Sequence, residues 1–178
     1  MRGLVPFAGQ HYSVTHLDSF PKPVQRPHPP LLIGAAGRRM LAIAAREADI
    51  VGFQTVSTAN GVVLNDPSVR LAPAVAQKVE QVRRVAGDRF ARIELSMVVT
   101  VVIADDREQA AERFARDRGW AGTSAAQVLE MPSVFIGPVD RIVESMQERR
   151  ERYGFSYYVL LDHAIDKVAP IVARLAGQ

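Results

Sequence analysis

Four small residues at positions 34–37, followed by an arginine, have the composition of a phosphate-binding loop. Gly34, Ala35, Ala36, Gly37 and Arg38 directly follow an apolar stretch. Small side chains let a ligand approach the backbone, and the free N–H groups of the helix expected behind them suit an anion such as a phosphate. The Arg38 guanidinium adds donors that match phosphate oxygens. The same pattern also fits an ordinary strand-to-helix turn, with Arg38 as a solvated cation.

Polar residues at the ends of two later apolar runs are further candidates. Gln54 and Thr55 follow the second run, and Asp162 and His163 follow the last one. A histidine in that position can bind substrate or transfer a proton, and the alternative is a surface histidine in a loop. The other histidines lack metal-ligand spacing, and neither Ser57 nor Ser96 has the context of a nucleophile. The sequence identifies no catalytic acid or base.

The composition excludes several classes of protein. The chain has 178 residues, a formal net charge of +3 and no cysteine, which rules out disulfides, thiolate metal sites and a cysteine nucleophile. The basic residues are scattered, so no nucleic-acid partner is expected. The sequence shows no leader and no run of 18 apolar residues, so no membrane association is expected. We therefore expect a cytoplasmic protein.

The elements that must position these residues alternate between strands and helices. Four short apolar runs predict strands, at 31–35, 49–53, 93–104 and 155–161. Helical spacing of apolar residues follows the runs, at 40–48, 75–86, 107–115, 138–153 and 166–176. This order predicts an α/β fold with four parallel strand–helix units. It fits an open doubly wound sheet or half of an eight-stranded barrel, since a whole barrel needs about 250 residues.

The remaining segments are predicted to be less regular. Residues 1–30 hold six of the 11 prolines and should form an extended arm with a short hairpin around Gly9. Residues 54–73 are predicted to be loop, and 119–136 irregular with one short helix at 125–129. The charged run 148–152 is interpreted as a solvated helix face.

Several motifs resemble those of the luciferase-like monooxygenase superfamily. They are Phe7-Ala8-Gly9-Gln10-His11-Tyr12, the proline-rich run 21–30, the loop 31–37, Ala44-Ala45-Arg46-Glu47-Ala48-Asp49, Phe135-Ile136-Gly137-Pro138 and Tyr153-Gly154-Phe155. The chain most resembles the branch that uses the deazaflavin coenzyme F420 in place of FMN. The resemblance covers nearly the whole chain, as a single luciferase-like domain over 1–178 with the arm at 1–30.

The resemblance implies the C-terminal half of a TIM (β/α)8-type barrel and an F420- or FMN-dependent oxidoreductase acting on a small organic molecule. Gly34, Ala35, Ala36, Gly37, Arg38 and Gln54 would bind the cofactor, and His163 the substrate. The family's first four strands would precede residue 1. A chain with four of the eight strands could be an enzyme of reduced activity or a non-catalytic half-barrel. It could also assemble as a homo-oligomer or with a partner that supplies the other half.

Overall fold

The computed structural model describes residues 6–15, 17–18, 20–59, 61–161 and 164–176. The chain divides into two units, residues 1–30 and 31–178. In the first unit, β1 (Phe7–Ala8) and β2 (Ser13–Val14) pair antiparallel, which confirms the expected hairpin. The other described residues of this unit form no helix or strand and are exposed, in keeping with a high proline content.

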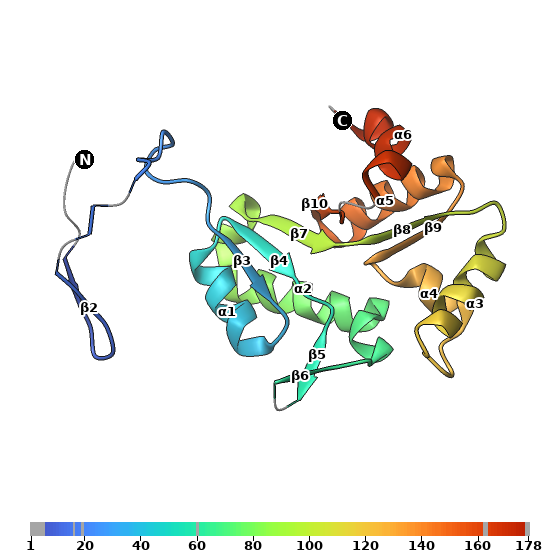
Figure 1. Ribbon diagram of the computed structural model, residues 1–178, viewed down its shortest axis with the longest axis horizontal. Helices are drawn as coiled ribbons and strands as arrows, with labels where there is room; N and C mark the ends of the chain where they lie inside the picture. Colours follow the sequence, from blue (N-terminus) through green and yellow to red (C-terminus); the bar gives the residue numbers. More distant parts are fainter. Residues whose placement is uncertain (1–5, 16, 19, 60, 162–163, 177–178) are drawn as a thin grey trace. The chain divides into compact units, whose positions relative to one another are not determined.

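The second unit is built on a parallel sheet of four strands in the order β10-β7-β4-β3 (Figure 1). These strands are β3 (Leu32–Ala35), β4 (Ile50–Phe53), β7 (Glu94–Val98) and β10 (Phe155–Val159). Each lies within one of the four apolar runs, and every pairing is parallel. The predicted α/β class with a parallel sheet is therefore confirmed.

Helices follow the strands and cover one face of the sheet. They are α1 (Arg38–Glu47), α2 (Ala72–Ala86), α5 (Val139–Tyr153) and α6 (Ile165–Leu175). Their apolar stripes enclose Val51, Phe53, Met97 and Phe155 in one core. The Phe53 and Phe155 rings meet edge to face, with centroids 5.3 Å apart. The opposite face of the sheet, reached by alternate residues, carries no helix among the described residues.

A further strand pair extends the third predicted strand, and this corrects one expectation. After Val99 the chain continues as β8 (Thr100–Ile103), which pairs in parallel with β9 (Val134–Gly137). Residues 134–136 are thus strand and not irregular. The connection carries α3 (Arg107–Asp117) and α4 (Ala125–Glu130), the second being the predicted short helix. Ser124 and Gln127 form a capping box at its start.

The predicted loop between residues 54 and 73 also contains regular structure. β5 (Ser57–Ala59) and β6 (Val62–Leu64) form an antiparallel hairpin, and η1 (Pro67–Arg70) is a 3-10 turn before α2. The prediction of loop was wrong there. After α2 comes a second 3-10 segment, η2 (Gly87–Arg92), and Gly87 at the junction has a φ of +54°, which glycine adopts without strain.

The interpretation of 148–152 as a solvated helix face was wrong for Arg149. Its side chain is buried, with 5% of its surface exposed. Arg149 Nη2 donates hydrogen bonds to the backbone oxygens of Leu129 and Met131, at 2.7 and 3.4 Å. Arg149 thereby ties α5 to the last turn of α4 and to the residue that follows it. Burial lowers the pKa of this guanidinium.

Candidate functional site

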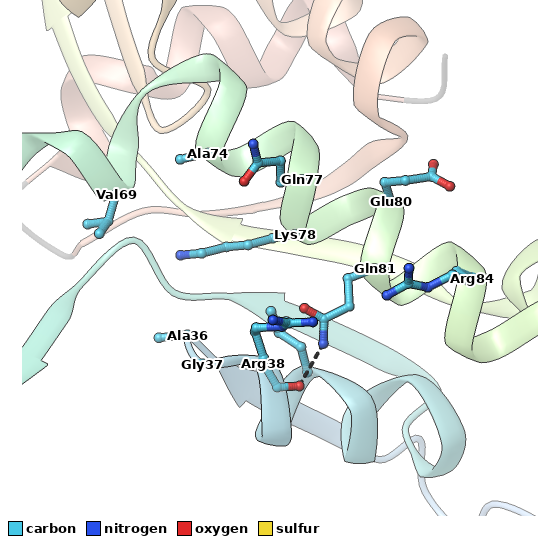
Figure 2. A pocket seen from close by; sticks show the side chains of 11 residues that line it. Ala36, Gly37, Arg38, Val69, Ala74, Gln77, Lys78, Glu80, Gln81 and Arg84 are labelled. Carbon is cyan, nitrogen blue, oxygen red and sulfur yellow. Dashed lines mark hydrogen bonds between the residues drawn. The ribbon is translucent and has the colours of Figure 1, made fainter.

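A cavity of about 520 Å³ lies between the start of α1 and one face of α2 (Figure 2). Ala36, Gly37 and Arg38 of the predicted loop line it. The residues that α1, η1 and α2 add are Leu41, Val69, Ala74, Gln77, Lys78, Glu80, Gln81 and Arg84. Gly34 and Ala35 belong to β3 and are not part of the lining. The structure therefore places the second half of the loop at the cavity.

Gly37 leaves the first turn of α1 open toward this cavity. It is the N-cap of α1, and its absent side chain provides no acceptor for the helix N–H groups. Its φ of −92° and ψ of 155° are available to any residue, so the backbone does not require glycine here. A Cβ at Gly37 would meet no protein atom within 4 Å. The missing side chain thus leaves space beside helix donors that can bind an anion.

Lys78, Gln81 and Arg84 of α2 complete the site, and sequence analysis did not identify them. Gln81 Nε2 donates to the backbone oxygen of Arg38 at 2.6 Å, which joins α2 to the loop. The cavity lining contains three cationic side chains, those of Arg38, Lys78 and Arg84, and one carboxylate, that of Glu80. In Figure 2 the Glu80 carboxylate points away from Arg38. The signal in the sequence was polar residues three apart on α2, opposite its valine stripe.

Lys78 is a half-buried cation beside the end of β4. Its Nζ donates to the backbone oxygen of Gln54 at 3.0 Å. Burial lowers the Lys78 pKa, and the positive charge of Arg70 lowers it further. Among the described residues, no carboxylate lies within 4.0 Å of Lys78 Nζ. A bound anion would offset both effects on this ammonium group.

Gln54 lies against the loop from the neighbouring strand. Its N–H donates to the oxygen of Ala35 at 2.9 Å, and a Cβ at Gly34 would lie 3.4 Å from Gln54 Nε2. Gly34 therefore makes room for this amide. The next residue, Thr55, is buried, and its Oγ1 accepts a hydrogen bond from Arg70 Nη1 at 3.0 Å. Asp162 and His163 lie outside the described residues.

The donor set of this cavity fits the phosphate of a flavin or deazaflavin cofactor. The open first turn of α1 and three cations around it are groups that bind phosphate in proteins, and the gap at Gly37 admits it. No group of three or more His, Cys, Asp or Glu residues stands together as a metal site in the part of the chain that the structure describes. None of the described helices has the length and apolar character needed to cross a bilayer.

Known structures with this fold were found at low sequence identity. An F420-dependent secondary alcohol dehydrogenase matches over 97% of this chain and 56% of its own, with 13% identity and a TM-score of 0.63. A coenzyme F420-dependent tetrahydromethanopterin reductase from Methanopyrus kandleri matches over 98% and 59%, with 17% identity and a TM-score of 0.63. The monooxygenase RslO1 from Streptomyces bottropensis matches over 88% and 47%, with 22% identity and a TM-score of 0.57.

These matches show the fold and its extent. The chain spans about half the length of the solved structures that it matches, and its parallel α/β architecture is a partial TIM-barrel fold, as expected. No curated protein matches the sequence. The family model described as luciferase-like monooxygenase matches residues 2–153. The chain therefore belongs to the luciferase-like monooxygenase family.

Proposed function

We propose that this chain binds the phosphate-bearing part of coenzyme F420, with FMN as the alternative, in the cavity at Ala36–Arg38. The observation that carries the proposal is the open first turn of α1 facing three cations across a cavity of about 520 Å³. The names of two structural neighbours, both F420-dependent, support F420 as the first choice. The reaction class is hydride transfer to or from a small organic substrate.

The residues of the site divide this task among them. The α1 first-turn amides donate to the phosphate, and Arg38, Lys78 and Arg84 balance its charge. Gln81 holds the loop through the Arg38 oxygen, and Gln54 lies at the adjacent strand end, where it can contact the cofactor chain. His163 is retained as the candidate for substrate binding. The bound cofactor supplies the hydride chemistry, while the chain supplies placement.

A fluorescence titration of the chain with F420 and with FMN tests this proposal. We expect saturable binding of F420 in the micromolar range and weaker binding of FMN. Arg38→Gln should weaken both by about tenfold, which corresponds to roughly 1.4 kcal/mol. As a matched control, Arg39→Gln removes the neighbouring charge, which is not part of the cavity lining. If neither cofactor binds at high micromolar concentration, the proposal is wrong.

A second candidate function is a non-catalytic half-barrel that assembles with another copy of itself. The sheet face without helices exposes apolar side chains: Leu32 is 50% exposed, and Val98 and Tyr157 are 41% exposed. The strand register places Gly34, Gly52 and Ser96 side by side on this same face. An uncovered apolar sheet face favours association.

Sedimentation velocity distinguishes this candidate from a monomeric cofactor-binding protein. We expect a dimer that Leu32→Lys converts to a monomer, because the introduced charge would be buried in the contact. The matched control is Met40→Lys, which adds the same charge at an exposed position on α1. A wild-type chain that stays monomeric at all concentrations would contradict assembly.

A further inference from the structure

Three cations from separate segments gather beyond the end of β4. Lys78 Nζ donates a hydrogen bond to the Gln54 backbone oxygen, and Arg70 Nη1 donates one to Thr55 Oγ1. Each distance is 3.0 Å. Arg118, at the end of α3, lies near Arg70 because both guanidinium groups contact the Trp120 ring. The Arg70 and Arg118 Cζ atoms lie 5.5 and 5.7 Å from the centroid of the Trp120 ring. We name Arg70, Lys78 and Arg118 the rim cluster.

Neutral contacts hold the two arginines of this cluster in place. Trp120 Nε1 donates to Asn65 Oδ1, and Asn65 Nδ2 donates to the Arg118 backbone oxygen, both at 2.6 Å. The Arg118 guanidinium also stacks on Phe114, with Cζ 3.5 Å from the ring centroid. Aromatic rings are favourable neighbours for guanidinium groups. The cluster is therefore ordered by rings and amides.

The rim cluster lacks a carboxylate partner among the described residues. None lies within 4.0 Å of the side-chain nitrogens of Arg70, Lys78 or Arg118. Burial lowers the pKa of Arg70, and the charge of Arg118 lowers it further. Burial also lowers the pKa of Arg118, while Asp117 acts in the opposite direction. The like charges of the cluster repel one another, and an anion bound between them would replace this repulsion with attraction.

The rim cluster continues from the cavity already described. Lys78 belongs to both, and Val69, which lines the cavity, directly precedes Arg70. A guanidinium has five N–H donors, and among the described residues Arg118 uses none of them in a hydrogen bond to the protein. These free donors can receive a planar or tetrahedral oxyanion.

We propose that Arg70 and Arg118, together with Lys78, form a second anion subsite that takes a carboxylate or phosphate group of the ligand. The proposal rests on the proposed function in one respect, because the first anionic group of that ligand is the phosphate held at Ala36–Arg38. The second group belongs either to the chain of the cofactor or to an anionic substrate. In both cases the group that binds the rim cluster is a carboxylate or a phosphate.

Calorimetric titration with inorganic tripolyphosphate tests the subsite without any cofactor. At low ionic strength we expect tripolyphosphate to bind the wild-type chain at least tenfold more tightly than orthophosphate, because it can span both anion sites. The double variant Arg70→Gln/Arg118→Gln should lose at least tenfold in affinity for tripolyphosphate. The matched control Arg46→Gln/Arg92→Gln removes two exposed charges at the other end of the strands and should change it less than twofold.

The same variants identify the source of the second anion. F420 carries carboxylates beyond its phosphate, whereas FMN carries the phosphate alone. If the cofactor supplies the group, the double variant weakens F420 and leaves FMN unchanged; if the substrate supplies it, neither cofactor is affected. A wild-type chain that binds tripolyphosphate but neither cofactor contradicts the proposed function and leaves the subsite supported.

Folding of the variants is checked by far-ultraviolet circular dichroism and urea denaturation, because the variants alter the surroundings of Trp120 directly. The charge-preserving double variant Arg70→Lys/Arg118→Lys should retain part of the tripolyphosphate affinity, since it keeps the charges and loses the fork. The subsite is wrong if tripolyphosphate does not bind the wild-type chain. It is also wrong if Arg70→Gln/Arg118→Gln, folded as the wild type is, binds this probe as tightly as the control.

Discussion

Gly37 is the residue on which ligand binding and protein stability can be separated. Its backbone is extended and its missing Cβ faces open space, so a larger residue fits the fold but occupies the cavity. We predict that Gly37→Leu weakens F420 and FMN binding by tenfold or more and shifts the unfolding free energy by less than about 0.5 kcal/mol. Fluorescence titration and urea denaturation measure the two effects. Unchanged affinity would show that no ligand approaches Gly37.

Lys78 gives the site a predictable dependence on pH. Burial and the charge of Arg70 lower the pKa of Lys78 from its ordinary value in the free protein, and a bound phosphate favours the charged ammonium and raises that pKa. The affinity for phosphate is therefore highest while Lys78 is protonated. It falls as the pH rises through the pKa that Lys78 has in the free protein. We predict weaker binding at alkaline pH in the wild type. Lys78→Arg stays charged and should bind with little change over the same range; equal profiles would contradict this role.

At the scale of elements, Gly137 fixes the passage from β9 to α5. Its φ is +144°, and a Cβ there would lie 2.9 Å from Arg107 Cγ; Arg107 Nε in turn donates to the Ile136 oxygen at 3.0 Å. We predict that Gly137→Ala lowers the free energy of unfolding by about 1–3 kcal/mol. Gly37→Ala, in extended backbone with open space, is the control and should have little effect. Equal urea midpoints for the two variants would contradict this reading of Gly137.

The elements also show what the sequence could and could not predict. Long β-branched and apolar runs identified the four sheet strands, because such residues favour strands and supply the core that packs under the helices. β9 was missed because its run of strand-forming residues, 134–136, is only three residues long and lies in a connection with glycines and a proline. The three residues of β6 are all exposed, so this strand has no buried face to create a pattern. Arg149 looked solvated within a charged run, and only the carbonyls of Leu129 and Met131 explain its burial.

The candidate site was predicted in part for the same physical reason. The loop at Ala36–Arg38 was visible because its composition is local. Lys78 and Arg84 were visible as cations on α2, but which helix face meets the loop depends on the packing of α1 against α2. The Gln81–Arg38 hydrogen bond spans 43 positions in the sequence. Contacts of that kind follow from the fold.

At the scale of the whole molecule, the chain contains a partial barrel together with the cavity to which we assign the phosphate. It spans about half the length of the solved structures that it matches, while all the residues that line the cavity lie between positions 36 and 84. We therefore propose that cofactor binding by this chain is separable from turnover. The phosphate end of the cofactor should be held even where hydride transfer needs further protein around the ring.

Comparing FMN with riboflavin tests the central claim most directly. The two molecules share the ring and the ribityl chain and differ by the phosphate alone. We predict that the chain binds FMN at least tenfold more tightly than riboflavin, and that Arg38→Gln/Lys78→Gln removes most of this difference. Titration by isothermal calorimetry at low salt measures both values. Equal affinity of the wild-type chain for FMN and riboflavin would contradict a phosphate site at Ala36–Arg38.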